Sequence, residues 1–231
     1  MISFVIPAHN EEHFLGPTIQ AIHGACVSLN ETYEVVVVDD DSTDRTAAIA
    51  TDHGAAVISV RHRQIAAARH AGTDAASGNI LIFVDADTLV SAPVVHQALD
   101  ALRIGAVGGA AIGIFEGRLP LYARAMAALW TRLARMATVT TGCFLFCTRT
   151  AYEAAGGFDR TLFVFEDVAL GRALRRVGRI VILRNSVSTS GRNLRGHSLA
   201  DAGRMLLAIA RNGREFFRSR DGLSYWYTTR R

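Results

Sequence analysis

Lysine is absent from the chain, because each of its 25 basic residues is an arginine. Chemistry that forms a Schiff base on the protein needs a primary amine, so it is excluded together with pyridoxal enzymes. The phosphate-binding loop that depends on a lysine is excluded for the same reason. The 231 residues also include only 4 prolines and no low-complexity segment or repeat. Half of them are hydrophobic, which is typical of a globular domain rather than a disordered, fibrous or repeat protein.

Long hydrophobic runs are absent as well. No window holds the roughly 18 consecutive apolar residues that indicate a transmembrane helix, and the start MISFVIPAHNEE lacks the features of a signal peptide. We therefore expect a cytoplasmic protein. Three cysteines, Cys26, Cys143 and Cys147, form no CxxC pair and have no histidine at zinc-finger spacing, which indicates buried reduced thiols. The net charge of +4 is too small to indicate a nucleic-acid partner.

Apolar runs alternate with helix-length segments through the first half of the chain. The expected strands are 2–6, 34–38, 55–60, 79–84 and 105–115. The expected helices between them are 11–29, 42–54, 64–78 and 92–105. Regular alternation of strand and helix predicts an α/β protein with a mostly parallel sheet.

The second half has a different pattern, with basic amphipathic segments at 119–137 and 199–219. Each could lie on an anionic membrane surface, pack against the core, or form a dimer contact. Between them we expect strands at 143–147 and 179–185 and a loop at 191–198. We also expect a helix that begins at Glu166 and Asp167, because residues 170, 173, 174 and 177 are apolar at helical spacing.

The stretch EVVVVDDDSTDRT, from residue 34, sends an apolar strand into Asp39, Asp40 and Asp41. Four valines without alternation predict a strand that is buried on both faces. The three carboxylates repel one another, so helix N-termini, cationic side chains, a metal or ligand donors must offset their charge. Ligands of parallel sheets bind beyond the carboxyl ends of the strands, where this cluster lies. The alternative is that Ser42 or Asp41 caps the next helix.

A second apolar run, ILIFVDADT, ends in Asp85 and Asp87. In an extended chain, two residues separated by one point to the same side. Paired carboxylates suit Mg²⁺ or Mn²⁺, which take one or two protein carboxylates and complete their coordination with water and phosphate oxygens. The alternative is a helix N-cap pair that shares the capping with Thr88 and Ser91.

Six ordered motifs together resemble family 2 nucleotide-sugar glycosyltransferases of the GT-A fold, over about residues 1–185. They are PAHNEE (7–12), DDDSTDRT (39–46), AAARHAG (66–72), ILIFVDADT (80–88), GGFD (156–159) and FEDVALGRAL (165–174). The resemblance implies a Rossmann-like, mostly parallel sheet flanked by helices, followed by a C-terminal amphipathic helical segment. A single domain, 1–231, would then comprise a nucleotide-binding half (1–115), an acceptor and catalytic half (116–198) and a C-terminal helix and tail (199–231).

The resemblance also implies inverting transfer of a sugar from a nucleoside diphosphate to a sugar, lipid-linked or small-molecule acceptor, with Mg²⁺ or Mn²⁺ as cofactor. A lipid-linked acceptor would bring peripheral contact with the inner face of a membrane. The site residues that it implies are Pro7, Ala8, Asn10 and Glu11 beside the nucleotide, Asp39 and Arg69 at the base, Asp85 at the ribose and metal, Asp87 and His197 at the metal, and Asp167 of the Glu166–Asp167 pair as general base. Arg192, Arg195 or His197 would close over the phosphates, unless this loop is a solvated basic turn.

Asp39 leads to an expectation about the nucleotide. Its carboxylate can accept a hydrogen bond from a ring N–H, which uracil, thymine and guanine carry but cytosine and adenine do not. We therefore expect UDP or dTDP sugars first and GDP sugars second, with Arg69 as the counter-charge of Asp39.

One of the positions that differ from the family pattern is Asp41. It stands where glycine is usual, which is tolerable because aspartate adopts left-handed backbone more readily than most residues.

Two other functions are alternatives to sugar transfer. A dehydrogenase needs GxGxxG after the first strand, and the glycine-rich run GAVGGAAIG lies after the fifth instead. The remaining alternative is an inactive nucleotide-binding or scaffold module of the same fold.

Overall fold

The structure is a computed structural model that describes residues 1–116, 132, 139–140 and 142–192. The amphipathic helix expected at 199–219 lies outside the described residues, as does that expected at 119–137 apart from residue 132. Arg195 and His197 also lie outside them. Among the described residues, no helix is both long enough and apolar enough to cross a bilayer.

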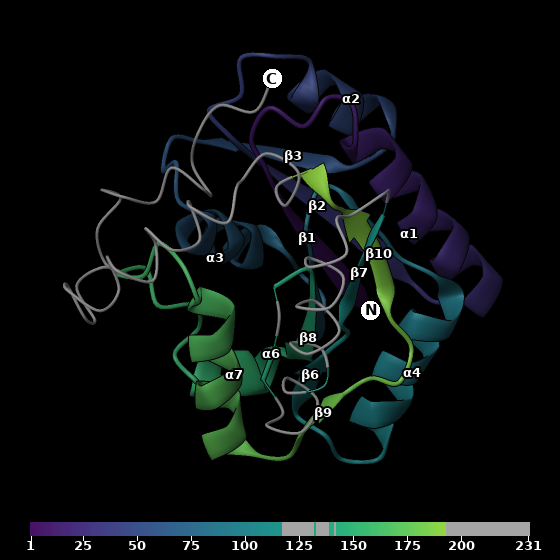
Figure 1. Ribbon diagram of the computed structural model, residues 1–231, viewed down its shortest axis with the longest axis vertical. Coiled ribbons are helices and arrows are strands. Elements are labelled where there is room, and N and C mark those ends of the chain that lie inside the picture. The colour runs from purple at the N-terminus through teal and green to yellow at the C-terminus, as the bar shows by residue number, and fades with distance from the viewer. Residues whose placement is uncertain (117–131, 133–138, 141, 193–231) are drawn as a thin grey trace.

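A seven-stranded sheet forms the centre of the molecule (Figure 1), in the order β3-β2-β1-β4-β8-β6-β9. Its strands are β1 (Ile2–Ala8), β2 (Tyr33–Asp40), β3 (Ala56–Val60), β4 (Ile80–Val84), β6 (Gly108–Ala110), β8 (Phe144–Thr148) and β9 (Ile180–Ile182). Only β8 pairs antiparallel with its two neighbours, β4 and β6. The other pairings are parallel, which confirms the expected mostly parallel α/β sheet.

A smaller sheet has the order β5-β10-β7, formed by β5 (Thr88–Leu89), β10 (Val187–Ser190) and β7 (Gly113–Glu116). The prediction of one strand over 105–115 is therefore wrong. The chain leaves the large sheet after Ala110 and joins the small one at Gly113, and between them the Ala111 N–H bonds to the Phe144 carbonyl at 3.0 Å. The small sheet brings the C-terminal side of the described chain next to the segment that follows β4.

Helices cover both faces of the large sheet (Figure 1). On one face lie α1 (Leu15–Leu29) and α4 (Ala92–Arg103), and on the other α3 (Ile65–Ala75), α6 (Arg149–Ala154) and α7 (Glu166–Val177). The helix predicted to begin at Glu166 is confirmed. The short α2 (Thr46–Asp52) packs beside α1 and β3.

The first two helices begin four residues later than the sequence predicts. The residues before them form two loops that hold each other in place. The Thr43 N–H bonds to Asn10 Oδ1 at 2.8 Å, and the Glu12 N–H bonds to Asp44 Oδ2 at 3.2 Å. These bonds tie the two loops to each other, ahead of the helices and beyond the carboxyl ends of β1 and β2.

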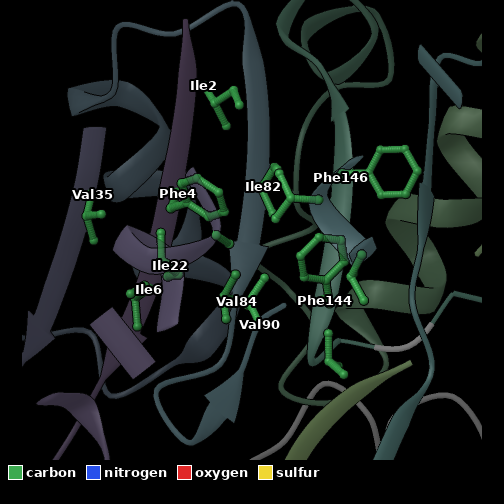
Figure 2. Packing of buried hydrophobic residues seen from close by; sticks show 14 of the residues in the cluster. Ile2, Phe4, Ile6, Ile22, Val35, Ile82, Val84, Val90, Phe144 and Phe146 are labelled. Atoms are coloured by element: carbon green, nitrogen blue, oxygen red, sulfur yellow. The ribbon is translucent and has the colours of Figure 1, made fainter. Parts of the chain in front are cut away.

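The valine run of β2 is buried on both faces, as predicted. Val35 and Val37 belong to the apolar cluster on the α1 side of the sheet, and Val36 and Val38 to the cluster on the α3 side. Figure 2 shows the first cluster continuing across β1, β4 and β8 through Phe4, Ile82 and the phenylalanines of β8. The sheet is therefore a rigid support for whatever its strand ends carry.

Helix α3 approaches the sheet unusually closely at Gly72. A Cβ at this position would lie 2.4 Å from Val5 Cγ1 and 2.7 Å from Val38 Cγ2. Real Cβ atoms do not come this close to other carbons, so the sheet and the helix would have to separate. The same helix carries Arg69 one turn earlier, so this contact also sets the depth of that arginine.

Gly72→Ala is therefore expected to lower the free energy of unfolding by about 1–3 kcal/mol, the usual effect of overpacking a core. Urea denaturation measures it. The matched control is Gly24→Ala on α1, where a Cβ meets nothing within 4 Å and alanine should stabilise the helix by about 0.5–1 kcal/mol. A Gly72→Ala protein as stable as the wild type would contradict the close approach of α3.

Candidate active site

The strand order reverses at β1, which lies between β2 and β4. Pairing of β1 with β2 continues to Ala8 and Asp39, but its pairing with β4 ends at Val5 and Phe83. Pro7, which has no N–H to donate, lies in the part of β1 that β4 no longer pairs. The two strands thus separate toward their carboxyl ends, at the point where α/β sheets bind ligands.

Asp39 and Asp40 end β2 and have different surroundings. Asp40 accepts hydrogen bonds at Oδ1 from the N–H groups of His62 (2.6 Å) and Arg63 (2.8 Å), and at Oδ2 from that of Gln64 (3.0 Å), just before α3. Asp39 is only 8% exposed, and its Oδ1 is buried without a hydrogen-bond partner among the described residues. Buried polar atoms are seldom unpaired, so Asp39 is the member of the pair that indicates a ligand.

The expected alternative for this cluster, a cap of α2 by Asp41 or Ser42, is wrong. Asp41 has a φ of 63° and pairs with Arg61 at 3.5 Å, so the left-handed backbone foreseen at this position is present. Ser42 Oγ accepts a hydrogen bond from the Asn10 N–H at 3.0 Å. It is Asp44 that accepts the Thr46 N–H, at 2.9 Å, at the start of α2.

Arg69 is the most deeply buried cation of the site, at 1% exposure. Its Nη1 donates to Glu166 Oε1 at 2.7 Å, and its Nη2 donates to Asp85 Oδ1 at 2.7 Å and to the Gly142 carbonyl at 3.0 Å. The guanidinium also lies 5.4 Å from the centre of the Phe158 ring. One side chain therefore joins the end of β4 to the start of α7.

This pairing corrects the prediction that Arg69 is the counter-charge of Asp39. Asp39 lies opposite Ala8 in the sheet, and Ala8 belongs to the cluster on the α1 side. Arg69 comes from α3, on the other side. Adjacent strand residues point to opposite faces, so Asp40 faces α3 and Asp39 does not.

Glu166 and Asp167 lie in the first turn of α7. They follow the N-cap residue Phe165, whose φ is 60°. Thr140 Oγ1 donates to the Asp167 carbonyl at 2.8 Å, and Asp167 Oδ1 accepts the Val168 N–H at 2.7 Å. The other carboxylate oxygen, Oδ2, reaches toward Arg69 over Gly142. A Cβ on Gly142 would lie 3.2 Å from that oxygen and 3.1 Å from Arg69 Nη2, so a residue without a side chain suits this position.

The two carboxylates are less acidic than usual. Burial raises the pKa of Asp167, and the charge of Asp85 adds to the effect, while Arg69 and the Val168 N–H partly oppose it. Burial raises the pKa of Glu166 to about 7, with the charge of Asp167 adding to it and Arg69 opposing it. Glu166 is bound to Arg69 and 6% exposed, whereas Asp167 is half-buried and more accessible to solvent.

Asp85 and Asp87 lie in a turn, in which the Thr88 N–H bonds to the Asp85 carbonyl at 3.0 Å. The prediction of an extended chain with both side chains on one side is therefore wrong. Asp85 binds Arg69, and Asp87 Oδ2 lies 3.2 Å from Arg192 Nη2. The capping alternative fails too, because the N-cap residue of α4, Ser91, makes no side-chain capping hydrogen bond in the described structure.

Most of these residues were candidates from the sequence, but several of their partners were not. Pro7 and Ala8 end β1, and Asn10 ties the loop after β1 to the loop after β2. Glu11 contacts Arg192, far along the chain. Gly142 and Thr140 were not foreseen, although a glycine just before a buried strand is a signal of close backbone approach.

The donor atoms suit Mg²⁺ or Mn²⁺ in kind, because Asp85 and Asp87 supply carboxylate oxygens at the end of β4. Within the described part of the chain, no group of three or more histidine, cysteine, aspartate or glutamate side chains is arranged to hold a metal. His197 lies outside it. The described residues therefore fit an ion that takes most of its ligands from water and from phosphate oxygens.

Comparison with known proteins identifies the family. Residues 3–154 match the family model described as glycosyl transferase family 2. The chain belongs to this family. Among curated relatives of this glycosyltransferase, the undecaprenyl-phosphate 4-deoxy-4-formamido-L-arabinose transferases of Pseudomonas aeruginosa (strain LESB58) and Yersinia enterocolitica are 38% and 36% identical to it over 94 and 93 residues. These stretches cover 38% and 37% of the chain, and only 28% of each relative's own length.

Solved structures show that the fold of the glycosyltransferase is GT-A, as the resemblance implied. S. aureus TarS in complex with UDP-GlcNAc has a TM-score of 0.65 at 17% identity, over 82% of this chain and 58% of that one. Glucosyl-3-phosphoglycerate synthase from Mycobacterium tuberculosis, with Mn²⁺ and UDP, has a TM-score of 0.58 at 23% identity, over 92% and 80%. The mannosyltransferase PcManGT of Pyrobaculum calidifontis, with GDP-Man and Mn²⁺, has a TM-score of 0.61 at 18% identity, over 94% and 66%.

The raised pKa of Glu166 predicts a pH-dependent stability. Between the ordinary value of 4.5 and about 7, the folded protein keeps a proton that the unfolded chain has lost, so stability falls as the pH rises through this window. Glu166→Gln removes this effect. The difference in free energy of unfolding, variant minus wild type, should rise by about 2 kcal/mol from pH 5 to pH 8 in urea titrations. Glu153→Gln, exposed on α6, is the control, and parallel pH curves for wild type and Glu166→Gln would refute the prediction.

Proposed function

We propose that this chain transfers a sugar from a nucleoside diphosphate to an acceptor, with inversion and in a single displacement, with Mg²⁺ or Mn²⁺ at the diphosphate. The observation that carries the proposal is the bridge made by Arg69. It holds Asp85, at the end of a central strand, and Glu166, beside Asp167, on one guanidinium at 2.7 Å each. Such a bridge keeps a donor-side carboxylate and a candidate general base within one side chain of each other.

The donor proposal has support from several solved proteins of the same fold. TarS was solved with UDP-GlcNAc, PcManGT with GDP-Man and Mn²⁺, and the mycobacterial synthase with UDP and Mn²⁺. Pro7, Ala8, Asn10 and Glu11 would border the nucleotide, and Asp39, with its unpaired oxygen, would read the base. A bound metal supplies Lewis-acid neutralisation of the leaving diphosphate, with Asp87 and Asp85 as its protein ligands and His197 as a proposed third.

In the displacement that we propose, the acceptor oxygen attacks the anomeric carbon opposite the diphosphate. A C–O bond forms on one face while the C–O bond to the diphosphate breaks on the other. The acceptor's proton passes to Asp167, whose raised pKa makes it a better base near neutral pH. Glu166 would position Arg69 rather than take the proton, because its own carboxylate is already bound to that guanidinium.

Two classes of acceptor group are candidates, a hydroxyl group and a lipid-linked phosphate. The curated relatives are named as undecaprenyl-phosphate sugar transferases, but the similarity covers only 94 residues of the first of them. A phosphate acceptor is already ionised at neutral pH and needs no base, whereas a hydroxyl group does. A lipid-linked acceptor would also imply peripheral contact with a membrane.

Asp167→Asn tests the proposed base, because the substitution removes it and nearly preserves its shape. With a hydroxyl acceptor, turnover should fall by roughly 100- to 10,000-fold while nucleotide affinity stays within about twofold. Nucleotide release from a panel of UDP-, dTDP-, GDP-, CDP- and ADP-sugars measures the rate, and calorimetry measures binding. A small loss of rate would indicate a phosphate acceptor.

Asp52→Asn, exposed on α2, serves as the control and should match the wild type in both measurements. An equal loss of affinity and rate in Asp167→Asn would make Asp167 a binding residue. If the wild type binds nucleotides but turns over none of the donors with any acceptor class, the inactive scaffold is the better description.

Asp39→Ala tests the reading of the base. We expect UDP or dTDP to bind best, GDP next, and CDP and ADP least, because only the first three carry a ring N–H for Asp39 Oδ1. The variant should lose about 1.5–3 kcal/mol with its best nucleotide, the range for a hydrogen bond to a charged group, and the ranking should flatten. Calorimetry with all five diphosphates measures both effects. Asp41→Asn, the half-exposed neighbour, should keep the wild-type ranking, and an unchanged ranking in Asp39→Ala would mean that the base is read elsewhere.

A further inference from the structure

A guanidinium already lies between two carboxylates beside the proposed metal position. Arg192 Nη2 contacts Glu11 Oε1, and Asp87 Oδ2 lies 3.2 Å from the same nitrogen. The exposed fractions of the three side chains are only 18%, 12% and 11%. The carboxylates follow β1 and β4, and the arginine follows β10, so three separate parts of the chain bring their charges together.

The spacing of the two carboxylate oxygens is limited by their common partner. Atoms that contact one nitrogen cannot lie further apart than about two hydrogen-bond lengths, roughly 6 Å. A divalent cation such as Mg²⁺ holds its oxygens at about 2.0–2.1 Å, so two of them come within roughly 3–4 Å of each other. A modest inward movement of the Glu11 and Asp87 side chains thus converts the guanidinium site into a divalent-cation site, and the two cations exclude each other there.

Arg192 is held in this position by its contacts, but not all of its N–H donors have a hydrogen-bond acceptor among the described residues. Its guanidinium carbon lies 4.4 Å from the centre of the Phe14 ring, a favourable stacking contact. Its Nε is buried and has no hydrogen-bond partner in the part of the chain that the structure describes. An unpaired buried donor is costly, so this arginine has a polar group that a new acceptor, such as a diphosphate oxygen, would satisfy.

We propose that Glu11 joins Asp87 as a ligand of the cation site and that Arg192 competes with the divalent metal for these two carboxylates. The inference rests on the metal dependence proposed above and adds Glu11 and Arg192 to it. While Arg192 occupies the site, the apparent affinity for metal is reduced by the fraction of molecules in which the site is open. A donor diphosphate that takes over Arg192 opens the site, so metal and donor bind cooperatively.

The test is a titration of the donor-free protein with Mn²⁺ alone, with free Mn²⁺ followed by electron paramagnetic resonance. Arg192→Gln should bind Mn²⁺ roughly three- to tenfold more tightly than the wild type, and Glu11→Gln at least about fivefold more weakly. Arg103→Gln is the matched control and should not change the affinity. That arginine also contacts two carboxylates, Glu31 at 2.9 Å and Asp100 at 3.3 Å, away from the site.

The double variant separates competition from a general effect of removing positive charge. If Arg192 competes with the metal at Glu11, adding Arg192→Gln to the Glu11→Gln variant should raise the affinity for Mn²⁺ by less than about twofold. The same gain in both backgrounds would mean that Arg192 acts only through its field, and the inference would be overturned. An unchanged affinity in either Glu11→Gln or Arg192→Gln overturns it as well.

Asp87→Asn distinguishes this inference from the proposed function. Suppose that Asp87→Asn loses Mn²⁺ binding while the Glu11 and Arg192 variants keep the wild-type affinity. This result would support a metal site at Asp87 and refute only the competition by Arg192. Wild-type affinity in all three variants refutes the metal site itself. Urea denaturation of each variant establishes that it is folded before it is titrated.

Discussion

The buried guanidinium of Arg69 is the interaction on which the rest of the site depends. It contacts Asp85 and Glu166 at 2.7 Å each and has almost no exposure to solvent. Removing such a cation leaves carboxylates buried without compensation, which is far more costly than losing a surface ion pair. Three structural features allow this contact. Gly72 lets α3 pack closely on the sheet, Gly142 has no side chain beside the guanidinium, and α7 begins at Glu166.

The charges of the site divide into two groups, each arranged around one arginine. Arg69 faces Asp85, Glu166 and Asp167, and Arg192 faces Glu11 and Asp87. Among the described residues, five carboxyl groups thus surround two guanidinium groups, so this part of the site carries an excess of acid groups. Part of that excess is reduced by the raised pKa values of Glu166 and Asp167. The remainder would attract a cation and oppose an unaccompanied diphosphate, so the proposed metal and diphosphate would suit the site better together than apart.

The sequence predicted the elements that local patterns determine. The valine run, the parallel series and the start of α7 all follow from apolar spacing, which depends on which faces are buried. The partners of the charged residues could not be predicted, because Arg69 and Glu166 are 97 residues apart and Glu11 and Arg192 are 181 apart. The turn at Asp85 was missed because an Asp-x-Asp motif alone fits both a strand and a turn. The exchange of strands at Ala111 was missed because a continuous apolar run does not reveal a change of sheet.

The absence of lysine acquires a structural meaning in this site. A buried lysine tends to lose its proton, because burial disfavours the charged form, and one ammonium group cannot span two carboxylates as a planar fork does. Burial likewise opposes the charge of Arg69, but the carboxylates of Asp85, Glu166 and Asp167 outweigh it and raise the pKa of the arginine. The guanidinium therefore stays charged near neutral pH, as arginine side chains do in proteins. In the proposed transfer, a proton would then pass from the acceptor to Asp167 while the bridge from Arg69 to Asp85 and Glu166 remains in place.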